Sequence, residues 1–159
     1  MLTIEGKPVY LMYLRDQISR EFDDEGNPTS KGAPVITLAF ALVENELAMG
    51  MSVCGLSDTP CKATGRTKAL GRLRAELKTG GAYSDKIRAS DLFYKFEEKD
   101  LQFLMNTVGA DVKFYSDEKN VVRELRFWGR DVIIPEADEG KHIVENLKRM
   151  EEKKAEVSA

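Results

Sequence analysis

Two apolar segments separated by a two-residue turn constrain this chain more than any other feature of its sequence. In residues 35–43 and 46–54, bulky side chains occupy every second position and smaller ones lie between them. This alternation is typical of β-strands, and apolar residues on both faces indicate strands that are covered on both sides. We therefore expect a central antiparallel hairpin with one thick face and one thin face. The bulky positions are Ile36, Leu38, Phe40, Leu42, Leu47, Met49, Met51 and Val53.

The rest of the sequence predicts a single α+β domain over residues 1–150, followed by a charged tail at 151–159 that we expect to fray. An apolar strand at 9–14 would extend the central hairpin into an antiparallel meander. We expect this β-meander to pack against a basic helix, with a second hairpin and a C-terminal amphipathic helix completing the domain. The further elements expected are helices at 60–79, 97–108 and 137–154, strands at 112–115, 121–128 and 131–134, a loop at 23–32 and a turn at 84–90.

The helix expected at 60–79 follows the hairpin directly. Thr59 is a suitable N-cap residue, and Pro60 suits the first helical position because that position needs no N–H donor. Gly80 and Gly81 would end the helix. The helical spacing of three leucines predicts its buried face, which consists of Leu70, Leu73 and Leu77.

Two glycines lie inside this helix, at Gly65 and Gly71. Each costs about 1 kcal/mol of helix stability relative to alanine. Close packing of the helix on the thin face of the sheet would compensate for that cost. The alternative is that the glycines let the backbone of a ligand approach the helix.

Charge is distributed unevenly along the chain, although the net charge is only −3. Residues 60–90 carry 8 basic and 2 acidic side chains, whereas residues 1–59 have a net charge of −5 and residues 91–159 a net charge of −4. The middle segment is either an electrostatic binding patch or a solvated helix face whose cations pair with carboxylates from the flanks. The candidate contacts to nucleic acid or to a protein partner are Lys62, Arg66, Lys68, Arg72, Arg74 and Lys78.

Arg66 is the anomalous cation, because on a helical wheel it falls within the arc of the three leucines. A buried guanidinium needs a bidentate partner, and Asp58 in the preceding loop is the nearest candidate in sequence. We therefore expect an Arg66–Asp58 ion pair. The alternative is that Arg66 reaches a phosphate or an acidic partner.

Signatures of catalysis and of metal binding are absent from the sequence. It contains no Walker A, G-x-G-x-x-G or G-x-S-x-G pattern, and its single histidine, His142, lies on the expected terminal helix. Cys54 and Cys61 do not have the C-x-x-C spacing of zinc or redox sites, although Cys61 in a first helical turn would have a lowered pKa. We expect no enzyme, no cofactor and no metal.

Cellular location is predicted from three further features. No apolar run approaches the about 18 residues that a membrane span needs. The first residues show no secretory signal, and two cysteines are too few for a disulfide framework. We expect a cytoplasmic protein with no membrane partner.

The segment after the hairpin has the pattern S-D-x-x-x-K-x-x-G-R-x-x-A-x-G-R-L. With the preceding V-C-G, it resembles small uncharacterised proteins encoded by bacteriophages and mobile elements. The resemblance covers about a quarter of the 159 residues and implies a phage-like accessory protein without an assigned activity. It is carried by Ser57, Asp58, Lys62, Gly65, Arg66, Ala69, Gly71, Arg72 and Leu73.

Two functions follow as expectations. The first is a non-enzymatic nucleic-acid-binding accessory protein that uses the basic segment 60–88, because rows of cations on a helix can follow a phosphate backbone. The second is a protein-binding modulator or inhibitor of a host complex. Aromatic residues downstream could stack on bases or form part of the core, and these are Tyr83, Phe93, Tyr94 and Phe96.

Overall fold

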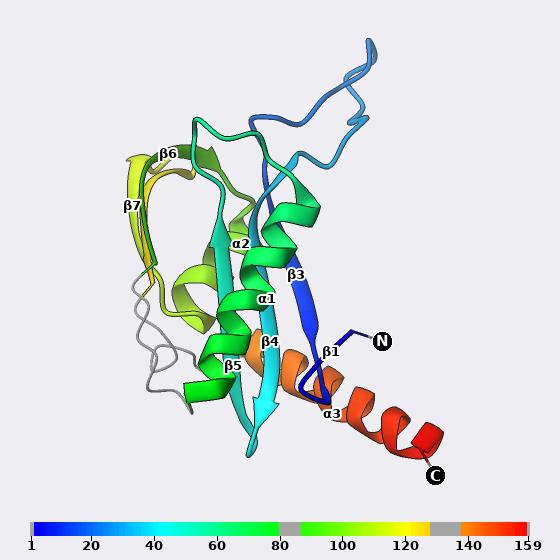
Figure 1. Cartoon of the computed structure of the whole chain (residues 1–159). Helices are drawn as coiled ribbons and strands as arrows, with labels where there is room; N and C mark the ends of the chain where they lie inside the picture. Colours follow the sequence, from blue (N-terminus) through cyan, green and yellow to red (C-terminus); the bar gives the residue numbers. More distant parts are fainter. Residues whose placement is uncertain (1, 80–86, 128–137, 159) are drawn as a thin grey trace.

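A three-stranded antiparallel sheet forms the centre of the fold (Figure 1). The computed structural model describes residues 2–79, 87–127 and 138–158. The sheet has the order β3-β4-β5 and is therefore the meander that the sequence predicts. Its strands are β3 (Tyr10–Asp16), β4 (Ala33–Val43) and β5 (Glu46–Val53). The turn between β4 and β5 places both Glu44 and Asn45 at positive φ, which matches the twist of a tight two-residue hairpin.

The two faces of this sheet carry different side chains, as the alternation predicts. Phe40, Leu38 and Met51 belong to the larger core cluster, on the thick face. Ala39, Ala41 and Ala48 belong to a separate, smaller cluster on the thin face. The thin face is covered by the helix α1 (Lys62–Thr79), and a short N-terminal hairpin of β1 (Thr3–Ile4) and β2 (Lys7–Pro8) adds Ile4 to the same cluster.

The backbone of α1 lies directly on β5 at Gly50. A Cβ atom placed on Gly50 would overlap the backbone oxygen of Ala69 and lie 2.5 Å from the backbone nitrogen of Leu73. At the start of the helix, Gly65 makes a similar approach, because its Cβ would lie 2.5 Å from Thr37 Oγ1. Close packing therefore explains Gly65, as expected, but not Gly71, where a Cβ would have nothing within 4 Å.

The thick face is covered by the second half of the chain. A second antiparallel sheet has the order β6-β8-β7. A short helix continues into a π-helical turn, which Gly109 ends at a φ of 73°. The C-terminal helix adds Ile143 and Leu147 to the same core. These elements are β6 (Ile87–Lys95), α2 (Glu98–Gln102), η1 (Phe103–Thr107), β7 (Asp111–Ser116), β8 (Val121–Phe127) and α3 (Asp138–Ser158).

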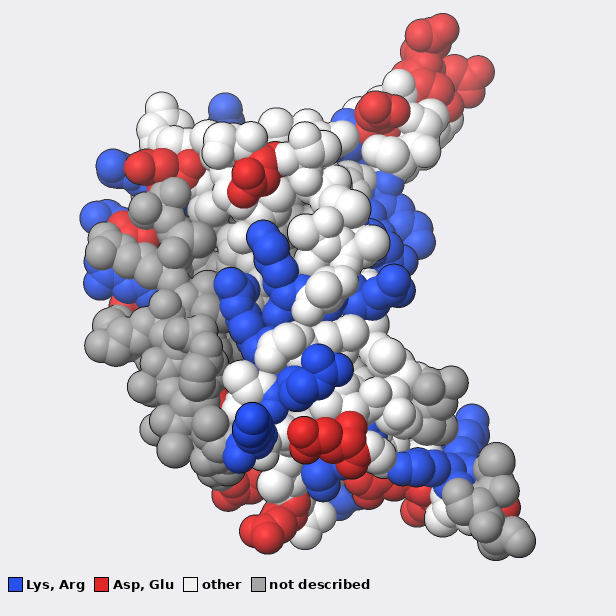
Figure 2. Space-filling view, viewed as in Figure 1, with Lys and Arg blue, Asp and Glu red and all other residues white. Residues whose placement is uncertain are grey.

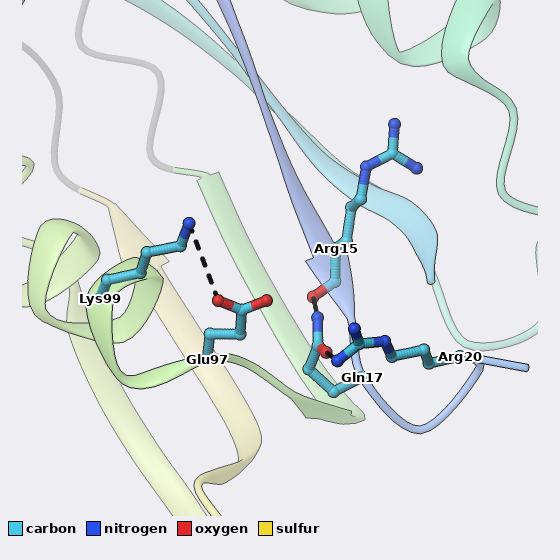
Figure 3. A network of polar contacts seen from close by, with 5 residues as sticks. All are labelled: Arg15, Gln17, Arg20, Glu97 and Lys99. Carbon is cyan, nitrogen blue, oxygen red and sulfur yellow. Dashed lines mark hydrogen bonds and ion pairs between the residues drawn. The ribbon is translucent and has the colours of Figure 1, made fainter. Parts of the chain in front are cut away.

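Hydrogen bonds between the C-terminal end of β3 and the C-terminal end of β6 join the two sheets. Asp16 is buried there, and its Oδ1 accepts hydrogen bonds from the backbone N–H groups of Ile18 and Lys95, at 3.1 and 3.0 Å. The backbone N–H of Gln17 donates to Lys95 O at 2.7 Å. Figure 3 shows the polar side chains around this junction, where Gln17 contacts Arg15 O and accepts from Arg20, while Lys99 pairs with Glu97 at 3.8 Å. From this junction the arm 17–32 projects away from the body of the protein (Figure 1).

Most of the predicted elements are confirmed, and the α+β class with a C-terminal helix is the one observed. The prediction of a turn at 84–90 is wrong for residues 87–90, which belong to β6 and pair with β8. The charged segment 151–159, for which we expected a frayed tail, is helical as far as Ser158, and Lys154 Nζ donates to Gly6 O. The strand expected at 131–134 lies outside the described residues.

None of the helices in the described ranges is long and apolar enough to cross a membrane.

The close approach at Gly50 predicts the effect of one added methyl group. Gly50→Ala should lower the free energy of unfolding by about 3 kcal/mol, because both clashing atoms belong to the helix backbone and cannot rotate away. The matched control is Gly71→Ala in the same helix, which should raise stability by up to about 1 kcal/mol through helix propensity. Chemical denaturation of the two variants measures both effects, and equal stabilities would contradict this packing.

Candidate nucleic-acid interface

The outward face of α1 carries most of the cations that the sequence identifies. Lys62, Arg66, Lys68, Arg74 and Lys78 are exposed, whereas Arg72 is half-buried. They project outward because the helix turns its small residues toward the sheet, with Ala69 and Leu73 fully buried. Figure 2 shows basic side chains gathered along α1 across the middle of this face. We call the five exposed residues the α1 basic face.

No carboxylate of the described residues forms an ion pair with the α1 basic face. The helix has one acidic residue, Glu76, and its side chain is on the packed side with only 4% of the residue exposed. Among the described residues, the ion pairs lie elsewhere, at Lys99–Glu97, Arg123–Asp91 and Arg126–Glu124. The interpretation of a helix face paired with carboxylates from the flanks is therefore not observed in the described part of the chain.

The Arg66–Asp58 ion pair is also not observed, and that expectation was wrong. Arg66 is exposed, and no ion pair joins it to Asp58, although both residues are described. The prediction of a buried leucine face is confirmed in part, because Leu73 is fully buried and Leu70 and Leu77 pack against the smaller cluster, but the centre of the packed face lies to one side of this arc. Leu70 and Leu77 are only partly buried, and Gly65, Ala69, Leu73 and Glu76 form the line that meets the sheet. The packed face is thereby turned away from Arg66 and toward Arg72.

Two of the six candidate cations contact the scaffold. Arg72 Nη1 donates to the backbone oxygen of Met51 on β5, which is the edge strand of its sheet. Lys62 Nζ lies 4.6 Å from the centroid of the Tyr13 ring, within the range of a cation–π contact. Arg72 therefore has a structural role that the sequence did not indicate. Arg66, Lys68, Arg74 and Lys78 are exposed and make no such contact within the described residues.

The candidate stacking aromatics within the described ranges do not join the α1 basic face. Tyr94 and Phe96 are buried in the larger core, and the Tyr94 hydroxyl donates to Cys54 O at 2.8 Å. Burial, followed by the nearby Cys54 thiol, raises the pKa of Tyr94 above its ordinary value. Phe93 packs edge-on against Tyr115 with ring centroids 5.2 Å apart. Tyr83 lies outside the described residues.

Helix α1 begins at Lys62, two residues later than predicted, and Cys61 is its N-cap residue instead of Thr59. The N–H of Gly65 donates to Cys61 O at 3.0 Å, which closes the first helical turn. Hydrogen bonds to the Cys61 thiol from the Thr64 hydroxyl and from the N–H groups of Thr64 and Ala63 lower its pKa, the Thr64 hydroxyl contributing most. The direction agrees with the expectation for a thiol at a helix N-terminus.

A cavity of about 290 Å³ adjoins the first turns of α1. The sequence did not indicate it, because its lining is assembled from three separate segments. The only signal was the presence of a hydroxyl at facing positions of two otherwise apolar strands. The lining residues are Pro34, Val35, Thr37, Ser52, Val53, Cys54, Asp58, Thr59, Cys61, Thr64, Gly65 and Lys68.

The described residues contain no candidate metal site, and the single histidine lies on α3. Within the described ranges, no group of three His, Cys, Asp or Glu side chains comes together as a metal site. His142 is on the exposed side of α3, where its Nε2 lies 3.2 Å from Asn146 Nδ2.

Comparison with protein-family models, with curated proteins and with solved structures finds no match to this chain. The ligand of the α1 basic face must therefore be inferred from its charge, its exposure and its surroundings.

The different surroundings of two arginines predict different stabilities for their alanine variants. Arg72→Ala should lower the free energy of unfolding by about 1–2 kcal/mol, because it removes the donor to Met51 O and the packing of the side-chain stem. The free energy of unfolding of Arg66→Ala should stay within about 0.5 kcal/mol of the wild-type value, as is usual for a surface side chain. Urea denaturation compares the stabilities of the two variants. A larger loss of stability for Arg66→Ala than for Arg72→Ala would support the buried Arg66–Asp58 ion pair instead.

The Cys61 thiol should react as a low-pKa thiol. In a Cys54→Ser background, the pH midpoint for alkylation by iodoacetamide should lie below the ordinary cysteine pKa of about 8.5. Adding Thr64→Val should move this midpoint upward, because the Thr64 hydroxyl makes the largest contribution to the lowered pKa. A midpoint that does not move in Thr64→Val would show that the hydroxyl does not stabilise the thiolate.

Proposed function

We propose that this protein is a nucleic-acid-binding accessory protein that acts through the α1 basic face and performs no catalysis. One observation carries the proposal, which is that five exposed cations of one helix make no ion pair within the described residues. Lys and Arg side chains that are left solvated in this way release condensed counterions when they meet phosphates, and this release drives binding.

The geometry of the α1 basic face suits a phosphate backbone. The helix has 18 residues and is therefore about 27 Å long, enough to lie beside several successive phosphates. The cations occur from the first residue, Lys62, to the last turn, at Lys78. Because Glu76 is buried, no carboxylate of α1 itself faces a bound strand.

The recognition should be largely independent of base sequence. Phosphate contacts fix the position of a protein on nucleic acid but carry no sequence information. Of the aromatic residues that could have stacked on bases, those in the described ranges belong to the core or to the second sheet, as Tyr94 and Phe93 show. The preference expected of α1 is therefore for charge and shape.

The acidic remainder of the protein does not cancel the α1 basic face. The arm 17–32 contains Asp23, Asp24 and Glu25, and its tip carries acidic side chains away from the basic side chains of α1 (Figure 2). Exposed charges separated by more than the Debye length of about 8 Å at physiological ionic strength are largely screened from one another.

A protein partner is the second candidate, and the arm 17–32 favours it. Ile18 and Phe22 on this arm are 59% and 58% exposed, next to the three acidic residues. Exposed large apolar side chains are characteristic of surfaces that bind proteins. A modulator of a host complex, of the kind that phages and mobile elements encode, would use this arm.

Salt dependence and charge reversal test the proposed function. Fluorescence anisotropy with labelled single- and double-stranded oligonucleotides should show affinity that falls steeply as salt rises. The double variant Arg66→Glu/Arg74→Glu should bind more weakly at every salt concentration, and its log–log salt slope should be smaller by about 2. The control with the same charge change is Lys141→Glu/Lys148→Glu on α3, both exposed, which should bind nearly as wild type.

We choose Arg66 and Arg74 for reversal because Arg72 contacts β5 and its loss would also affect stability. No binding at low salt, or equal losses in the two double variants, would contradict the proposed function. The arm 17–32 would then become the first surface to test with a protein partner.

A further inference from the structure

We propose that the cavity at the N-terminus of α1 binds a nucleoside 5′-phosphate, either as a free nucleotide or as the 5′ end of a strand. The cavity lies between the first turns of α1, the paired ends of β4 and β5, and the loop that joins β5 to α1. Its volume of about 290 Å³ is close to the lower limit of about 300 Å³ for small-molecule sites. It has room for one mononucleotide and for little more.

Two hydroxyl groups that open into the cavity indicate a ligand. Thr37 and Ser52 are 2% and 5% exposed, face each other across β4 and β5, and line the cavity. Neither hydroxyl makes a hydrogen bond with another residue in the described part of the chain. Because the two residues are buried while their hydroxyl oxygens stay open to the cavity, a ligand that enters the cavity can hydrogen-bond to both.

The Thr37 hydroxyl is aimed at the start of α1. A Cβ placed on Gly65 would lie 2.5 Å from Thr37 Oγ1, so any other residue at this position would crowd the hydroxyl. Glycine at position 65 thus keeps open the space between the sheet and the helix. The alternative interpretation of this glycine, as a point where a ligand approaches the helix, applies here together with close packing.

One end of the cavity suits a phosphate. Cys61, Thr64, Gly65 and Lys68 are spaced i, i+3, i+4 and i+7, so one side of α1 lines the cavity over its first two turns. The first turn of α1 has no acidic residue, and the dipole of the helix favours an anion near its N-terminus. Lys68 adds a full positive charge one turn farther along.

The rest of the lining suits a sugar and part of a base. Asp58 also lines the cavity, and its carboxylate folds toward Gly55, where Oδ2 would lie 3.0 Å from an added Cβ. A carboxylate repels phosphate but accepts hydrogen bonds from ribose hydroxyls. The sugar and base would contact an apolar wall formed by Pro34, Val35 and Val53. Asp58 therefore orients the ligand, with the phosphate toward Lys68, and inorganic phosphate alone should bind more weakly than a nucleotide.

Calorimetric titration of the full chain tests the cavity directly. The probes are the four nucleoside 5′-monophosphates, each compared with its nucleoside. At least one monophosphate should bind, and its nucleoside should bind about tenfold more weakly, since hydrogen bonds to charged groups are the stronger class. Each of the variants Ser52→Ala and Lys68→Gln should weaken the binding of the monophosphate by a similar factor.

Two controls separate a binding effect from a folding effect. Ser52→Ala removes a hydroxyl that opens into the cavity and makes no hydrogen bond in the described part of the chain, so its melting temperature should equal or exceed that of wild type. Lys78→Gln removes a cation from the last turn of the same helix and should leave monophosphate binding unchanged. Equal weakening by Lys68→Gln and Lys78→Gln would overturn the site, because it would show a general charge effect.

A second titration distinguishes the two sources of the phosphate. If the natural ligand is a strand end, a 5′-phosphorylated oligonucleotide should bind about tenfold more tightly than its 5′-hydroxyl form, and Ser52→Ala should abolish the difference. If it is a free nucleotide, the monophosphate binds and the two oligonucleotides bind equally. If a monophosphate binds and neither oligonucleotide does, the result contradicts the proposed nucleic-acid-binding function and supports the nucleotide site. No monophosphate binding, with no difference between the oligonucleotides, would overturn the site.

Discussion

The contact between the backbone of α1 and Gly50 on β5 determines how the rest of the thin face is arranged. At this point the helix and the sheet approach each other with no side chain between them on the strand side. Such an approach requires small residues on both elements, and Ala39, Ala48 and Ala69 supply them. Because interiors are closely packed, this contact fixes the rotation of α1 about its own axis as well as its distance from the sheet.

The rotation of α1 decides which cations reach the solvent. With Gly65, Ala69 and Leu73 against the sheet, Arg66 and Arg74 are exposed on one shoulder and Lys68 on the other. Arg72 is drawn inward far enough to donate to an edge carbonyl of β5. A helix whose packed face was centred on Leu70, Leu73 and Leu77 would have presented a different set of charges. The close contact at Gly50 and the electrostatic surface are therefore consequences of the same packing.

The same contact opens the cavity at the start of the helix. Where the thin face continues past Gly50 toward the ends of β4 and β5, its residues change from alanine to Thr37 and Ser52. The loop that returns from β5 to α1 passes beside these hydroxyls and brings Asp58 and Cys61 to the cavity. The cavity and the α1 basic face share Lys68, so a ligand in one is electrostatically linked to a ligand on the other.

The sequence by itself determined the elements and the two-sided sheet. The alternation of large and small residues in 35–54 has only one consistent arrangement, because a shift of one residue would exchange the faces of the whole hairpin. The inward positions of α3, Ile143 and Leu147, followed from helical spacing in the same way. The basic character of α1 was also evident, since local charge is a property of sequence alone.

Only the tertiary structure decided the rotation of α1, the role of Arg72 and the existence of the cavity. The helical wheel centred the packed face on the leucines because hydrophobicity predicts which side chains avoid water, whereas the contact at Gly50 brings the backbone of Ala69 and Leu73 onto the sheet. The residues at the cavity, Thr37, Asp58 and Lys68, are well separated in sequence and make no local pattern. Their proximity depends on strand register and on the depth at which the helix packs, and both are set by contacts between distant segments.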